Sequence, residues 1–204
     1  MKKIFFSVII VVVLKGCTSH NTATTSVPPQ QDSTVANEIK KDSFFPVTSF
    51  IKGQMILLDS LPVTPLHTVT INHKTDSVWL KKAELIPLLA DFISPEIKET
   101  NLISYFKETS FNDLTLNSVT MTYDPVTVLP DSLSLRHWDI YINPESGNVV
   151  KVYIVKQFKK KEGVVIQQLT WKTNKWALIT TLLNKPNDST QLLKEEKFIW
   201  NFNE

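Results

Sequence analysis

Apolar residues recur with two different periods along this chain, and the change of period divides its folded part into two halves. In the first half the spacing is helical over 46–58 and 82–92, and a third, shorter helix is expected over 101–108. Between the first two helices, residues 67–71 alternate between apolar and polar and predict one strand, followed by a turn at 74–76. The first half is therefore expected to be mostly helical.

The second half of the folded part has a period of two. Strands are predicted over 117–123, 133–142, 149–158, 164–172, 176–183 and 194–200. Polar connections at 143–148, 159–163 and 173–175 are short. Connections of that length join antiparallel neighbours, because a parallel pair needs a crossover of about a dozen residues or more. These strands are therefore expected to form an antiparallel meander.

Together the two halves predict an α+β fold, with two or three N-terminal helices packed on an antiparallel, mostly meander sheet of about six or seven strands. Residues 38–204 have the length of one domain. Residues 17–37 are mostly Ser, Thr, Asn, Gln and Pro. A segment of this composition cannot bury enough surface to offset its chain entropy, so we expect a disordered tether.

The N-terminus has the pattern of an export signal. Lys2 and Lys3 precede an apolar run from Ile4 to Leu14. The run is shorter than the about 20 apolar residues that a membrane-spanning helix needs. It is followed by the single cysteine of the chain, Cys17. Residues 1–16 are therefore expected to be a signal peptide.

Leu14, Gly16 and Cys17 resemble the lipobox of bacterial lipoproteins, from which Lys15 departs. The resemblance implies cleavage before Cys17 and acylation of its thiol. The alternative is an ordinary secretory signal with an incidental cysteine. The whole chain also resembles envelope lipoproteins of Bacteroidota. Since no acidic residue follows Cys17 closely, the sorting logic of lipoproteins implies an outer-membrane anchor that faces the periplasm.

Charge and glycine content exclude several classes of function. Loss of Lys2, Lys3 and Lys15 with the signal changes the net charge from +2 to −1, so the basic balance does not indicate nucleic-acid binding. The few glycines form no phosphate-binding loop and no dinucleotide fingerprint. His67 and His73 would lie about 20 Å apart on one strand, too far to share a metal ion. We therefore expect no cofactor and no metal site.

His137 and Asp139 are the best polar pair in the sequence. They share one face of the strand that also carries Trp138 on its other face, so the imidazole and the carboxylate can form a hydrogen bond. One interpretation is an acid/base pair. The other is the solvent-facing side of a sheet, where polar residues normally alternate with apolar ones.

Aromatic residues are concentrated in the predicted meander, which holds four of the five tryptophans. They suggest an apolar face that could accept a ligand. The alternative is a curled sheet whose two faces are partly buried by the helices and by its own curvature. The candidate apolar ligand face consists of Trp138, Tyr153, Trp171, Trp176 and Trp200.

The leading hypothesis is a lipid-anchored, non-enzymatic binding or assembly module of the cell envelope. Its partners would be the membrane, through the lipid on Cys17, and an envelope protein or lipid. Two alternatives remain open at this point: a carrier of lipid or lipoprotein with an apolar cavity, and a hydrolase that uses His137 and Asp139. No catalytic residue is assigned.

Overall fold

The computed structural model describes residues 44–115, 117–186 and 189–203. The expected signal peptide (1–16), the lipidation candidate Cys17 and the expected tether up to residue 37 lie outside these residues. All described residues belong to the unit Asp42–Glu204.

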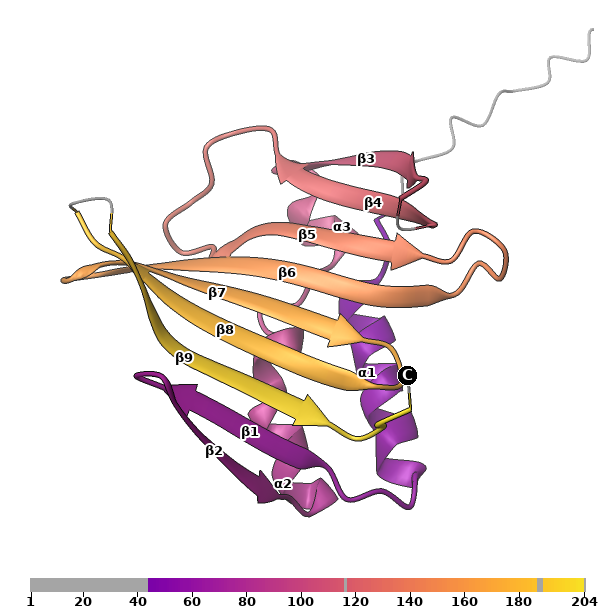
Figure 1. Ribbon diagram of the computed structural model, residues 1–204. Coiled ribbons are helices and arrows are strands. Elements are labelled where there is room, and N and C mark those ends of the chain that lie inside the picture. Colours follow the sequence, from indigo (N-terminus) through magenta and orange to yellow (C-terminus); the bar gives the residue numbers. More distant parts are fainter. Residues whose placement is uncertain (1–43, 116, 187–188, 204) are drawn as a thin grey trace, which may run out of the picture. The chain divides into compact units, whose positions relative to one another are not determined.

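One nine-stranded antiparallel sheet makes up most of the described structure (Figure 1). Strands β3 to β9 follow one another as a meander, and the hairpin β1–β2 joins the edge of β9, where Leu66 lies opposite Ile199. The order across the sheet is β2-β1-β9-β8-β7-β6-β5-β4-β3. The strands are β1 (Leu66–Ile71), β2 (Lys74–Trp79), β3 (Phe106–Asp113), β4 (Ser118–Pro125), β5 (Leu135–Ile142), β6 (Val149–Lys160), β7 (Gly163–Lys172), β8 (Trp176–Asn184) and β9 (Thr190–Ile199).

The described helices lie behind the sheet in the view of Figure 1 and pack on one of its faces. They are α1 (Val47–Ser60), α2 (Lys82–Leu88), the 3-10 helix η1 (Ala90–Ile93) and α3 (Glu99–Leu102). Helix α1 buries Val47, Ile51, Met55 and Leu58 against the sheet, which is the helical spacing that its sequence predicts. None of the helices in the described ranges has the length and apolarity needed to cross a membrane.

The predicted fold class, an α+β domain with a sheet of about six or seven strands, is wrong. The structure is dominated by its nine-stranded sheet, and the helices after α1 have seven residues or fewer. The turn expected at 74–76 is part of strand β2. The helix expected at 101–108 ends at Leu102 with α3, and strand β3 begins at Phe106. The two strands that were not predicted, β2 and β3, lie at the edges of the sheet. Polar residues face solvent on both sides of an edge strand, which weakens the alternation of apolar and polar residues.

The core lies between the helices and one face of the sheet. The rings of Tyr123 and Trp138 stack with centroids 4.6 Å apart, and Phe44 meets both of them edge-on. Further along the sheet, Phe92 of η1 packs on Trp171 at 5.4 Å. Aromatic side chains bury large apolar areas, so these contacts help to hold η1 and the segment before α1 on the sheet.

A buried lysine adds a polar contact to this core. Lys156 of β6 is 3% exposed, and its ammonium donates hydrogen bonds to the backbone carbonyls of Asp91 and Ser94. These carbonyls belong to η1 and its C-terminal end. Because a buried ammonium needs such partners, Lys156 fixes the position of η1 on the sheet.

Candidate functional site

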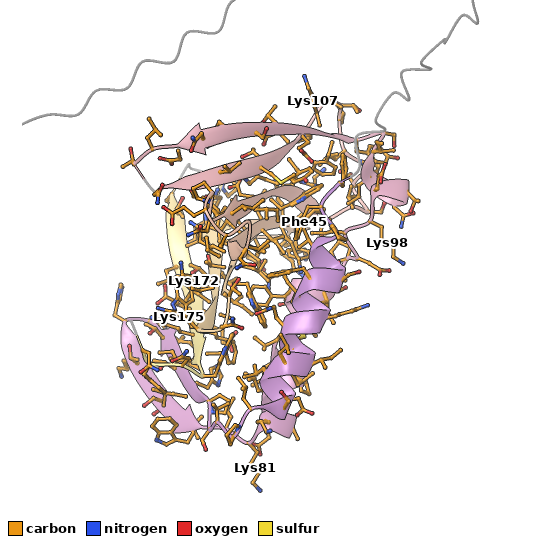
Figure 2. The ribbon with its side chains drawn as sticks, turned by 90° about the vertical axis from the view of Figure 1, so that its right-hand side faces the viewer. Phe45, Lys81, Lys98, Lys107, Lys172 and Lys175 are labelled. Carbon is orange, nitrogen blue, oxygen red and sulfur yellow. The ribbon has the colours of Figure 1, made fainter. Side chains whose placement is uncertain are left out.

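The face of the sheet opposite the helices is called the open face here. Figure 2 shows Lys172 and Lys175 on this side of the sheet, away from α1. Successive side chains of a strand point to opposite faces of the sheet. The residues next to a core residue such as Trp138 or Val152 therefore point to the open face. Over strands β4 to β8 the open face carries Thr122, Asp124, His137, Asp139, Tyr141, Lys151, Tyr153, Lys172 and Trp176.

His137 lies between two carboxylates on the open face. Its Nε2 is 3.0 Å from Oδ2 of Asp139, and its Nδ1 is 2.8 Å from Oδ1 of Asp124. The hydroxyl of Thr122 donates to the other oxygen of Asp139 at 2.7 Å. Thr122 pairs directly with Asp139 across β4 and β5, and Asp124 lies two residues further along β4. The pairing of these two strands therefore builds the cluster.

Both ring nitrogens of His137 face acceptors, which favours the protonated imidazole. The hydrogen bond to Asp139 raises the pKa of His137 to about 8, against the opposing effect of burial and with further help from Asp124. Burial alone would raise the pKa of Asp139, but the hydrogen bonds from His137 and Thr122 hold it below its usual value. At neutral pH the cluster is an imidazolium between two carboxylates.

The two carboxylates hold the charged imidazole of His137 in place, and this arrangement is poorly suited to proton transfer. A general base needs a free nitrogen within hydrogen-bond reach of a substrate proton. Here Asp139 and Asp124 occupy both nitrogens of His137. Thr122 donates to Asp139 and not to the imidazole, so His137 does not activate its hydroxyl.

A row of four side chains crosses the open face beside this cluster. Trp176 lies directly opposite Lys172, which lies opposite Lys151, which in turn lies opposite Tyr141. The Lys151 ammonium sits 3.5 Å above the centre of the Tyr141 ring. Burial and the nearby charge of Lys172 lower the pKa of Lys151, and burial raises the pKa of Tyr141 to about 12.

The five residues of the candidate apolar ligand face do not share one face of the sheet. Trp138, Trp171 and Trp200 are 0%, 0% and 5% exposed, and they pack in the core on the helix-covered side. Tyr153 and Trp176 are half-buried on the open face. The reason is the register: Trp171 lies opposite Ala177, so its neighbour Trp176 points the other way. Of these five residues, Tyr153 and Trp176 alone are accessible to a ligand of the open face.

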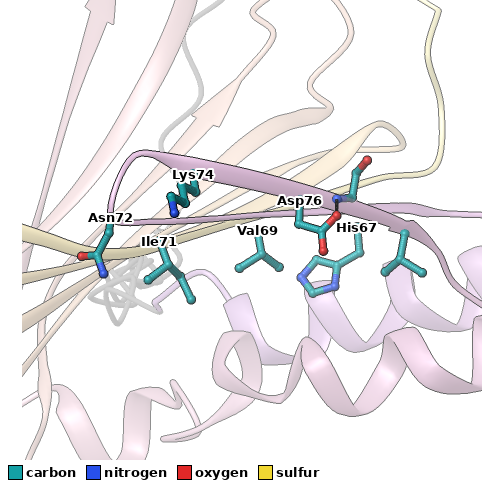
Figure 3. A pocket seen from close by; sticks show the side chains of 8 residues that line it. His67, Val69, Ile71, Asn72, Lys74 and Asp76 are labelled. Carbon is teal, nitrogen blue, oxygen red and sulfur yellow. Dashed lines mark hydrogen bonds between the residues drawn. The ribbon is translucent and has the colours of Figure 1, made fainter.

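A second candidate is a hollow of about 520 Å³ along the helix side of the hairpin β1–β2 (Figure 3). His67, Val69 and Ile71 line it from β1 and Val78 lines it from β2. The imidazole of His67 stacks on Phe198 with centroids 4.3 Å apart, and burial lowers its pKa. The surface of the hollow is mostly apolar, and the charged residues Lys74 and Asp76 also line it.

Within residues 44–115, 117–186 and 189–203 no group of three or more His, Cys, Asp or Glu side chains is placed to hold a metal ion. No protein-family model matches the chain, no curated protein matches it, and no solved structure matches its fold.

Proposed function

We propose that the chain is a non-enzymatic binding or assembly module of the cell envelope, anchored through lipid on Cys17, and that it binds its partner through the open face. The observation that carries this proposal is the combination of half-buried aromatic rings and fixed charges on that face. Tyr141 and Tyr153 present rings next to the His137 cluster, and Trp176 presents a third ring on β8.

Binding surfaces commonly have this composition. Their energetic centres are rich in aromatic side chains held in place by neighbours, with a few polar groups that give specificity. Tyr141 is held under Lys151, and the ring of Tyr153 meets that of His137 edge-on at 6.2 Å. Rings that are already fixed lose little conformational entropy when a partner binds.

The hydrogen bonding of His137 supports binding over hydrolysis. A hydrolase would need the His137–Asp139 pair to act on a substrate, but Asp124 occupies the nitrogen that would face it. The same cluster can serve a binding surface as a fixed set of charges.

Site-specific photocrosslinking in intact cells tests the open face. A photoreactive residue at Tyr153 or Trp176 of the full chain should give crosslinked products in the envelope fraction. The control position is Ile56 of α1, which is 73% exposed and lies on the helix side. Equal yields at all three positions, or none at Tyr153 and Trp176, would overturn the proposal.

The anchor has its own test. Replacement of Cys17 by Ala should release the chain from membranes or leave the precursor uncleaved. Protease added to intact cells should spare a periplasm-facing outer-membrane anchor, and should cut the chain after the outer membrane is permeabilised. Unchanged membrane association together with an unmodified thiol in the wild type would exclude lipidation.

A second candidate function is the carrier of lipid or lipoprotein, which the apolar hollow at β1–β2 favours. A fluorescent palmitic acid should then bind the wild-type chain and lose affinity with Val69→Glu. Val126→Glu is the control, since Val126 is 58% exposed and does not line the hollow. Equal binding to all three proteins would argue against a carrier.

A further inference from the structure

Two lysines are paired on the open face, at the end of the ladder between β6 and β7. Lys151 of β6 and Lys172 of β7 are directly paired across the two strands, and both are half-buried. Like charges at directly opposed positions of a sheet are destabilising. Such a pair is therefore costly unless an opposite charge lies nearby.

No carboxylate in the described ranges forms an ion pair with Lys151 or Lys172. Asp139 is the acidic side chain that acts on Lys151, but it accepts hydrogen bonds from His137 and Thr122. Lys151 instead places its ammonium over the ring of Tyr141. The ring and the more distant charge of Asp139 therefore offer partial compensation for the two ammonium groups.

We propose that Lys151 and Lys172 bind a phosphate group carried by the ligand or partner of the open face, an inference that rests on the proposed binding function of that face. A phosphomonoester carries close to two negative charges at neutral pH, which matches two ammonium groups. Each ammonium has three donors for the three free phosphate oxygens. A carboxylate, with a single charge, would neutralise only one of the lysines.

The neighbours of the pair suit the rest of such a molecule. Tyr141 and Trp176 flank the two lysines in the same cross-strand row and offer apolar ring faces on both sides. Lys197 adds a third ammonium, 5.3 Å from the centre of the Trp176 ring. The site thus combines a central anion position with two aromatic walls, which could hold either a phosphorylated soluble compound or the headgroup of a phosphate-bearing lipid.

Calorimetric titration of the full chain in uncharged detergent micelles tests this site. The probes are inorganic phosphate, glucose 6-phosphate, and phosphatidic acid added to the micelles, with glucose and phosphatidylcholine as uncharged or zwitterionic controls. We expect binding of the phosphate probes and not of the controls. Tightest binding of glucose 6-phosphate would identify a soluble source, and tightest binding of phosphatidic acid a lipid headgroup.

The variants separate this site from general charge effects. Lys151→Met with Lys172→Met should weaken binding by roughly tenfold or more, since charge-assisted contacts are lost on both sides. Lys159→Met with Lys160→Met removes the same charge from exposed positions of β6 and should leave affinity unchanged. Lys151→Arg with Lys172→Arg keeps both charges and should retain most of the binding. This variant still tests the role of charge if the Met variant does not fold.

Two outcomes would overturn the phosphate site: no binding of any phosphate probe to the wild type, or equal affinity in the wild type and the Lys151→Met, Lys172→Met variant. If crosslinks from Tyr153 persist in either case, only the phosphate site fails. If the crosslinks are also absent, the proposed function of the open face fails with it.

Discussion

The Nε2 atom of His137 lies 3.0 Å from Oδ2 of Asp139, two residues further along the same strand. Both side chains project from the open face, since Trp138 between them points into the core. Asp139 is nevertheless 8% exposed, so its charge is held in a partly dry setting. The hydrogen bond between the two side chains therefore links the protonation of His137 to the stability of the sheet.

The first prediction concerns pH. The folded-state pKa of His137 is about 8, above its unfolded value of about 6.5. A raised pKa contributes stability that is fully present below pH 6.5 and is lost as the pH rises through 8. His137→Gln should therefore cost about 1 to 2 kcal/mol more at pH 6 than at pH 9. Urea unfolding of both proteins at the two pH values measures the difference.

A matched variant checks the assigned cause. Asp124→Asn leaves the Asp139 contact in place and should lower the pKa of His137 in an NMR titration of its imidazole. An unchanged pKa would show that Asp124 does not contribute.

The second prediction compares two tryptophans. Trp171 is fully buried and packs on Phe92 and Trp200, so Trp171→Ala should cost about 3 to 5 kcal/mol of unfolding free energy. Trp176→Ala should cost less than about half as much, because truncation on the open face leaves no enclosed cavity. Denaturant unfolding of both variants decides the comparison. Equal losses would mean that the two rings are equally buried.

The third prediction concerns Lys156. Lys156→Met keeps the apolar stem but leaves the carbonyls of Asp91 and Ser94 without their donor, at a cost of about 1 to 3 kcal/mol. Lys159 lies on the same strand at an exposed position, and Lys159→Met, which removes its ion pair with Asp131, should change stability by less than about 0.5 kcal/mol. Thermal unfolding of the two variants provides the measurement, and a neutral Lys156→Met would contradict the role given to this lysine.

The fourth prediction compares two turn glycines. An added Cβ at Gly163 would lie 2.2 Å from the carbonyl oxygen of Asn184, whereas one at Gly147 would meet nothing within 4 Å. Gly147→Ala should therefore cost only the left-handed backbone penalty of about 1 to 2 kcal/mol. Gly163→Ala also forces β7 and β8 apart at this point and should lose more stability. Similar losses in both variants would contradict the close approach.

The sequence predicts the central strands well because their alternation and short polar turns are local signals. Strands β4 to β9 fall on the six segments predicted, with shifted ends. Strands β2 and β3 escape prediction because edge strands can be polar on both sides. All six residues of β2 are exposed, so no alternation distinguishes its two faces.

The candidate site is predicted only where it lies on one strand. His137 and Asp139 can be paired from their spacing, but Asp124 reaches the cluster through the register of β4 and β5, which local sequence does not specify. The Lys151–Lys172 pair depends on register in the same way. Trp171 and Trp176 lie on opposite faces of the sheet because of the register of β7 and β8, which local sequence does not specify either.

Binding at the open face is tested most directly by the yield of crosslinked product from a photoreactive residue at Tyr153 when Trp176 is replaced by Ser. Trp176 is an accessible ring of the open face, and loss of an aromatic anchor commonly costs more than about 1 kcal/mol of binding energy. We predict a yield lowered by roughly fivefold or more, with an unchanged yield for the control Ile56→Ser on the helix side and cooperative unfolding of both variants. Equal yields in the Trp176→Ser and Ile56→Ser variants would contradict the claim that the open face is the binding surface.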